Sequence, residues 1–183
     1  ITVDSVSTGV DNSLGVEVEN DSTISSFAVG NITPVSIASG KTLSGGIGVT
    51  AGSIKLTDNG TLASNVSMSG GTTLDADNTL TVSGTLAHTG DITIDVAGTR
   101  TLTYTGTPIS LGEHTLKLMG GGNLLSGGLK INNVNSKLLL SSITVDSVST
   151  SVDNSLGVEV ENDSTISNFA VGHITPVSIA SGK

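Results

Sequence analysis

The stretch LTVSGTLAHTGDITIDVAGTRTLTYTGT, residues 80–107, shows the pattern that decides the fold. Short apolar–polar–apolar triplets, such as Leu80-Thr81-Val82 and Ile92-Thr93-Ile94, alternate with Gly, Asp and Ser, which favour turns. A period of two places both apolar residues on one face of a strand and the Thr on the other. The stretch therefore predicts short, half-buried strands that are separated by tight turns.

The same triplet recurs along the whole chain. Further copies are Ile1-Thr2-Val3, Val16-Glu17-Val18, Val35-Ser36-Ile37, Ile54-Lys55-Leu56, Val66-Ser67-Met68, Leu102-Thr103-Tyr104, Leu116-Lys117-Leu118 and Leu129-Lys130-Ile131. No window of the sequence carries apolar residues at helical spacing, so we expect almost no helix.

Strands of three to five residues need a fold that stacks them, because isolated short strands are unstable. In a β-solenoid each strand stacks on its counterpart in the next coil, about 4.8 Å along the axis. The chain has only three aromatic residues, which fits a narrow aliphatic lumen. The prediction is therefore all-β: a parallel β-solenoid, a right-handed β-helix, of about five to seven coils. One division starts coils near Val35, Val66, Ile92, Leu116 and Ile143.

Residues 1–41 and 143–183 are nearly the same sequence. They differ only at Gly9/Ser151, Ser26/Asn168 and Asn31/His173, so 38 of the 41 positions match. We interpret residues 1–142 as one full repeat unit and residues 143–183 as the start of the next, in one continuous solenoid without a linker. Tandem units of this kind complete each other's buried faces. We therefore expect a piece of a longer array, whose partners are neighbouring units.

Composition and charge exclude several classes of function. The formal net charge of −9 disfavours nucleic acid as a partner. The chain has no cysteine, hence neither a disulfide framework nor a thiolate metal site. No run of 18 apolar residues is present, so this segment is not expected to span a membrane.

Two acidic runs could offer oxygen ligands to calcium, residues 17–21 and the pair Asp75 and Asp77. The run that contains Asp75 and Asp77 lacks the Gly at loop position six and the Glu at position twelve that an EF-hand requires. We interpret these acids as solvated turn residues, and we expect no metal site and no cofactor, with at most weak calcium binding.

Two other patterns suggest chemistry but have simpler interpretations. The run ASGKT at residues 38–42 resembles the end of a phosphate-binding loop, but Val35 stands where that loop needs Gly. We expect a turn there. His88, His114 and His173 are far apart in sequence, and His173 replaces Asn31 in the other copy. We interpret all three as surface residues without a catalytic role.

The sequence does not favour an enzyme or an ice-binding surface. β-Helical polysaccharide lyases and hydrolases gather acids with Arg or Lys in a cleft, whereas this chain has a single arginine, Arg100. The Thr-rich run at residues 99–107 is similar to ice-binding solenoids, but unequal coil lengths are expected to break its Thr columns. No catalytic, cofactor-binding or metal-binding residue is therefore assigned.

In style the chain resembles the giant tandem-repeat β-helical surface proteins of bacteria, including filamentous-haemagglutinin-like adhesins and autotransporter passengers. Residues 60–99, GTLASNVSMSGGTTLDADNTLTVSGTLAHTGDITIDVAGT, carry this likeness, which extends along the whole chain without a diagnostic motif. The resemblance implies export to the cell surface and a role as a fibre, stalk or adhesin.

The leading hypothesis is thus structural: a segment of an extracellular repeat protein that is not an enzyme. The alternative is a carbohydrate-active β-helix. A cell-surface or glycan ligand is not identified by the sequence. We also expect self-association, end to end or lateral, because a solenoid end exposes unpaired strand edges.

Overall fold

The structure is a computed structural model, and it describes residues 1–9 and 14–180. These residues form 22 strands and no helix, arranged in two sheets. Sheet A has 13 strands: β1 (Thr2–Thr8), β3 (Ser22–Val29), β5 (Thr42–Val49), β7 (Thr61–Leu62), β8 (Asn65–Met68), β10 (Leu80–Val82), β11 (Leu86–His88), β13 (Thr101–Tyr104), β14 (Ile109–Ser110), β16 (Asn123–Leu125), β17 (Leu129–Ile131), β19 (Thr144–Thr150) and β21 (Thr165–Val171). Sheet B has nine: β2 (Val16–Val18), β4 (Thr33–Ile37), β6 (Ser53–Leu56), β9 (Thr73–Ala76), β12 (Ile92–Val96), β15 (Thr115–Met119), β18 (Lys137–Ser141), β20 (Gly157–Val160) and β22 (Val177–Ile179).

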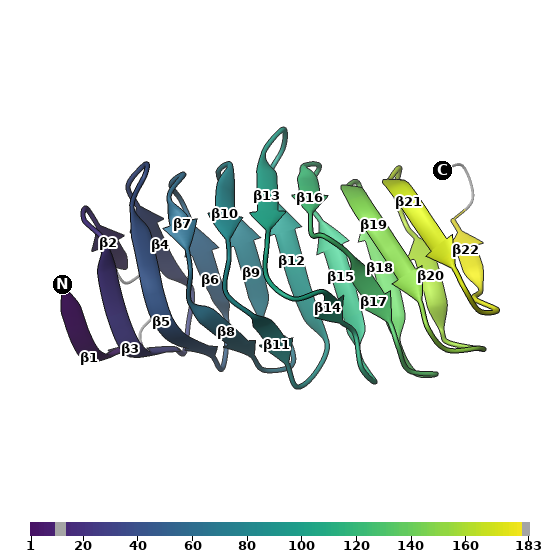
Figure 1. The fold of residues 1–183 in the computed structure, drawn as a ribbon, viewed down its shortest axis with the longest axis horizontal. Helices are drawn as coiled ribbons and strands as arrows, with labels where there is room; N and C mark the ends of the chain where they lie inside the picture. Colours follow the sequence, from purple (N-terminus) through teal and green to yellow (C-terminus); the bar gives the residue numbers. More distant parts are fainter. Residues whose placement is uncertain (10–13, 181–183) are drawn as a thin grey trace.

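The chain crosses from one sheet to the other and back, so that each coil adds one layer to both. Every ladder between named strands is parallel, as in β12 on β9 and β15 on β12. The layers follow the sequence along the long axis of the molecule, with β1 at one end and β22 at the other (Figure 1). The prediction of a parallel β-solenoid is confirmed.

The predicted number of coils is wrong. Sheet B contributes one strand to each coil, so its nine strands mark about nine coils instead of five to seven. Stacked partners are 19 residues apart at Leu43↔Leu62 and 24 apart at Ile92↔Leu116, the two extremes. The predicted coil starts mixed the two sheets, because Val35 lies in β4 of sheet B and Val66 in β8 of sheet A. Alternation cannot distinguish the sheets, since both point apolar residues into the same lumen.

The core is the lumen between the sheets. Alternate residues of each strand are buried there, as in β12, where Ile92, Ile94 and Val96 are buried and Thr93 and Asp95 are not. The lumen is mostly aliphatic, but it also contains Phe27 and Tyr104. The Tyr104 hydroxyl accepts a hydrogen bond of 3.0 Å from the Leu86 backbone N–H, which satisfies both buried groups.

One glycine is required by the stacking of β5 on β3. The register of this ladder shifts between Ile24 and Phe27, and Gly45 faces Ile24 with a φ of +117°. A Cβ at Gly45 would lie 1.8 Å from the Ile24 carbonyl oxygen. Gly48, in the same strand, has no atom within 4 Å of its Cβ position.

Candidate functional site

The strand at the N-terminal end of the solenoid has the same sequence as a second strand that is covered on both sides. β1 and β19 have the identical sequence TVDSVST, but β1 is an end strand, whereas β19 lies between β16 and β17 on one side and β21 on the other. Ile1 is 81% exposed, and the equivalent Ile143 is 2% exposed. The preceding strands β16 and β17 cover β19, and β1 has no such strands before it.

The C-terminal end shows the reverse. β4 is covered by β6, and its residue Ile37 is 4% exposed. The equivalent Ile179 in β22 is 62% exposed, because β22 is the last strand of sheet B. Each copy of the repeat thus buries the part that the other copy leaves open. Each end of the solenoid therefore exposes one cross-section of the lumen.

The ion pairs also differ between the two copies. In the second copy, Glu159 Oε2 lies 2.7 Å from Lys137 Nζ and Glu161 Oε2 lies 3.3 Å from Lys117 Nζ. Both lysines belong to preceding coils, in β18 and β15. The equivalent Glu17 and Glu19 form no ion pair within residues 1–9 and 14–180. Two carboxylates at the N-terminal end therefore have partners only where a preceding coil exists.

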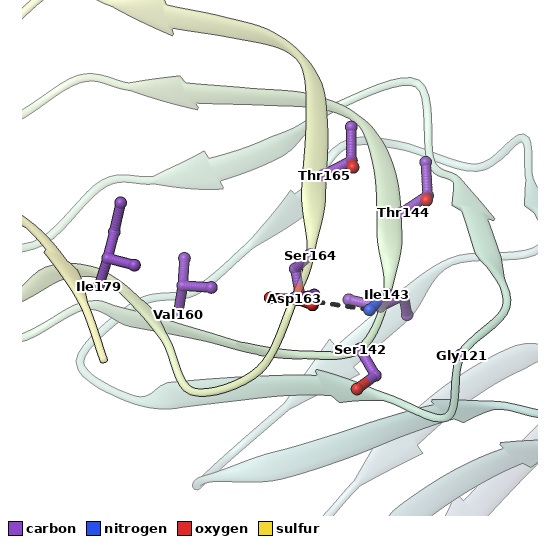
Figure 2. Close-up of a pocket in the computed structure, with 9 residues that line it drawn as sticks. All are labelled: Gly121, Ser142, Ile143, Thr144, Val160, Asp163, Ser164, Thr165 and Ile179. Carbon is purple, nitrogen blue, oxygen red and sulfur yellow. Dashed lines mark hydrogen bonds between the residues drawn. The ribbon is translucent and has the colours of Figure 1, made fainter. Parts of the chain in front are cut away.

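A corner hollow of about 650 Å³ opens at the C-terminal end between the two sheets. Figure 2 shows its lining: Gly121, Ser142, Ile143, Thr144, Val160, Asp163, Ser164, Thr165 and Ile179. The Ser164 hydroxyl oxygen accepts a hydrogen bond of 3.2 Å from the Ile143 backbone N–H (Figure 2).

The equivalent corner of the first copy shows what fills such a hollow. There Asp21 Oδ1 accepts a 2.9 Å hydrogen bond from the backbone N–H of Thr42, one coil further on. Asp163, the equivalent of Asp21, receives no such bond from the described residues. The hollow is thus an uncovered corner with an aspartate acceptor at its rim.

Several other acids in turns have the same role, which the sequence did not reveal. Asp91 accepts the Thr115 N–H at 2.7 Å, and Asp153 accepts the Ile174 N–H at 2.8 Å. Each bond joins residues about one coil apart and satisfies a backbone donor, at the start of β15 for Thr115 and in the turn between β21 and β22 for Ile174. The prediction of solvated turn acids covered residues 17–21 and the pair Asp75 and Asp77; it is wrong for Glu17, which lies in β2, and for Asp75, which lies in β9.

The predicted calcium candidates Asp75 and Asp77 do lie close together, but a lysine lies between them. Lys55 Nζ is 3.5 Å from Asp75 Oδ2 and 2.8 Å from Asp77 Oδ2. The hydrogen bond to Asp77 raises the pKa of Lys55. Burial raises the pKa of Asp75, although the charge of Lys55 opposes this shift. The ammonium group occupies the space in which a cation would bind.

No group of three or more His, Cys, Asp or Glu side chains suitable for a metal ion occurs in the part of the chain that the structure describes. The acidic run at residues 17–21 is spread over β2 and the turn that follows it, at the N-terminal end.

The run ASGKT forms a turn between β4 and β5, in which the Lys41 N–H bonds the Ala38 carbonyl at 2.9 Å. No helix follows Thr42, which begins β5. The local structure is the predicted turn.

The histidines are placed differently from each other. His173 is exposed, and its Nδ1 lies 3.2 Å from Asp153 Oδ1. His88 and His114 are half-buried, and their rings meet edge to face at 5.5 Å. His88 Nε2 lies 3.0 Å from the carbonyl oxygen of Ser110, in the next coil. The contact between His88 and His114 was not predicted, because the two residues are far apart in sequence and become neighbours only when the coil length is known.

One column of threonines runs along the outside of sheet A. Thr42, Thr61, Thr81 and Thr103 are successive partners in register. The expectation that unequal coil lengths would break Thr columns is wrong for these four, because the extra residues lie in turns. The column stops at Leu125, which faces Thr103 and is exposed.

The first strands, β1 and β2, and the last strands, β21 and β22, each have one unpaired edge in the structure, with exposed apolar residues such as Ile1 and Ile179 beside it. The described residues contain no helix long and apolar enough to cross a membrane. Comparisons with protein-family models, with curated proteins and with solved structures gave no match.

Proposed function

We propose that the chain is a structural segment of a tandem-repeat protein that forms an extracellular fibre, stalk or adhesin at a cell surface. Its two ends are contact surfaces for the adjoining repeat units. The observation that carries the proposal is the contrast between the copies: Glu159 and Glu161 pair with lysines of preceding coils, whereas Glu17 and Glu19 have no such coil beneath them. A preceding unit would supply the same lysines.

The regularity of the coils supports a structural role. Successive coils differ by only a few residues in length, from 19 to 24, so no coil carries a long insertion. An enzyme on such a scaffold needs its site once, in a singular insertion, whereas a stalk repeats one unit. Seven steps lead from β1 to β19 in sheet A. At about 4.8 Å a step, each unit would lengthen a rod by about 34 Å.

The proposed location outside the cell fits the means by which this fold is stabilised. The chain has no cysteine, and its strands are held by continuous parallel ladders and by bonds between coils such as Asp21 to Thr42. Such a fold does not depend on disulfides in an oxidising environment. Antibodies raised against the folded chain should label intact source cells; labelling only after lysis would refute the proposed location.

An extended chain tests the stacking of units. Residues 101–142 are added before Ile1, so that β1 and β2 gain the coils that cover β19 and β20. Hydrogen exchange of residues 2–8 should slow to the level of residues 144–150 in the same molecule. A prefix with the same composition in scrambled order is the control, and equal exchange with both prefixes would refute the proposal.

The ion pairs give a second measurement on the same molecules. Glu17→Gln should lower the stability of the extended chain by up to about 1 kcal/mol, the range of partly exposed pairs. It should leave the original 183-residue chain unchanged, because no lysine among residues 1–9 and 14–180 pairs with Glu17 there. Glu113→Gln is the matched control, because Glu113 forms no ion pair in the part of the chain that the structure describes.

A further inference from the structure

Sheet A is interrupted at one place in the interior of the solenoid. β5, β8 and β11 are joined by ladders, and so are β14, β17 and β19, but in the described part of the chain no ladder joins β11 to β14. β11 and β14 belong to successive coils (Figure 1). The same two coils are joined elsewhere by β10 on β13 and by β12 on β15. The boundary between β11 and β14, which we call the seam, therefore lacks a ladder on one side of the coil only.

The spacing of residues explains the interruption. Stacked partners are 22 residues apart in the β10–β13 ladder and 24 apart in the β12–β15 ladder. Leu86 and Ile109, the buried residues of β11 and β14, are 23 apart. At a spacing of 22, Ile109 would stand opposite the exposed Ala87, and a slip of one residue turns a side chain to the wrong face. Pro108, directly before β14, also has no N–H to donate to a ladder.

Two side chains take the place of the missing ladder. The Tyr104 hydroxyl accepts the Leu86 N–H at 3.0 Å. His88 Nε2 lies 3.0 Å from the Ser110 carbonyl oxygen, and His88 Nδ1 lies 3.0 Å from the Gly90 carbonyl oxygen. A neutral imidazole has one N–H, so it can donate to only one of these two carbonyls at a time. The seam is thus held by side-chain bonds that can break without disturbing a ladder.

We propose that the seam is a hinge at which the solenoid bends. β11 and β14 separate there, the β10–β13 and β12–β15 ladders stay intact, and His88 and Tyr104 limit the opening. Regions without a continuous ladder open at a lower free energy than the strands around them. The hinge depends neither on the chain ends nor on the proposed function. Residues 86–110 lie outside the repeated segments 1–41 and 143–183, so each unit of a tandem array would carry one such hinge.

The position of the seam also fixes the direction of bending. Sheet B runs from β2 to β22 without interruption, and the other half of sheet A continues through β7, β10, β13 and β16. Bending at any of these ladders would break backbone bonds. The solenoid should therefore bend so that the side that carries β11 and β14 widens.

Spin labels measure this bending, because the chain has no cysteine of its own. Ser67→Cys/Lys130→Cys places labels on β8 and β17, three coils apart across the seam. Ala28→Cys/Ala87→Cys places them on β3 and β11, also three coils apart, where a ladder joins every step. All four residues are exposed. The closed state puts the Cα atoms of each pair about 14 Å apart, so the pairs are matched.

Pulsed electron paramagnetic resonance should give a wider distance distribution for Ser67→Cys/Lys130→Cys than for Ala28→Cys/Ala87→Cys, with an added component at longer distances. His88→Ala removes the contact with Ser110 and should widen the first distribution further while leaving the second unchanged. A narrow second distribution also shows that the variant is folded. Equal widths for the two pairs, or a first distribution that His88→Ala leaves unaltered, would overturn the inference.

Hydrogen exchange gives a second measurement on the unmodified chain. The Leu86 N–H is bonded to the Tyr104 hydroxyl, whereas the N–H of its ladder partner Val66 is bonded to the Thr85 carbonyl oxygen, away from the seam. Leu86 and Val66 are both buried. Opening of the seam frees only the Leu86 N–H, which should therefore exchange at least about tenfold faster than that of Val66. Equal protection of the two amides would show that the seam stays closed and would refute the hinge.

Discussion

The repeated segment allows one substitution to be compared in two environments with the same flanking sequence. Ile37 and Ile179 both lie in the sequence TPVSIASGK, residues 33–41 and 175–183, but they are 4% and 62% exposed. Ile1 and Ile143 show the opposite order, 81% and 2%. Ile→Ala at each of the four positions removes the same atoms, and local strand propensity is closely matched within each pair.

The expected magnitudes follow from burial. Ile→Ala removes three carbons, worth about 2.4 kcal/mol at about 0.8 kcal/mol for each buried carbon, and the remaining cavity adds to this. Ile37→Ala and Ile143→Ala should therefore lower the free energy of unfolding by about 2–5 kcal/mol. Ile179→Ala should cost less than about 1 kcal/mol and Ile1→Ala less than about 0.5 kcal/mol, in proportion to the surface that remains buried.

Urea denaturation followed by circular dichroism measures the four values, with hydrogen exchange to detect local opening of the terminal coils. The measurement is made at low protein concentration and low salt, so that association does not cover Ile179. The diagnostic result is the order of the stability losses: the loss at position 37 exceeds that at position 179, and the loss at position 143 exceeds that at position 1. Equal losses within either pair would refute the assignment of the terminal coils.

Four further outcomes are expected. Tyr104→Phe leaves a buried backbone N–H without its acceptor and should cost about 1–3 kcal/mol by urea denaturation; no loss would contradict that bond. Gly45→Ala should cost at least about 1–3 kcal/mol from its positive φ and the carbonyl clash, whereas Gly48→Ala should be neutral or slightly stabilising. Burial raises the pKa of Asp75, so the native state binds its proton more readily; the stability of the unmodified chain relative to Asp75→Asn should therefore rise as pH falls from neutral toward 4, and a constant difference would argue against the shift. Because Lys55 occupies the acidic pair, calcium should raise Tm by no more than about 1–2 °C, and a shift above about 10 °C would reveal a true site.

The sequence was sufficient for the class of fold because the alternation in triplets such as Ile92-Thr93-Ile94 reports burial directly. It was insufficient for the coil length, because strands of both sheets show the same alternation. The length of a coil is set by its turns. Residues in turns are determined by hydrogen bonding, about which hydrophobic periodicity gives no information.

The candidate site was missed for the same reason. Lys137 and Glu159 are 22 residues apart, and Lys55 and Asp75 are 20 apart, so both pairs become neighbours only once the coil length is known. The repeat itself was visible, but the sequence alone did not show which half of each copy would be covered. That depends on the strands before and after it in the stack.

The near-identity of residues 1–41 and 143–183 also leaves the folding chain with two acceptable positions for each copy. Either copy matches the strands that the other contacts, so a growing solenoid could accept the wrong one and skip seven coils. Closing a loop of 142 residues instead of about 20 costs about 1.7 kcal/mol more in chain entropy, close to a twentyfold preference for the nearer copy. Errors of this size are tolerable in one molecule and accumulate in a long array. Folding that proceeds from one end, as the chain emerges, would remove the ambiguity, because the wrong copy would not yet be present when each coil is laid down.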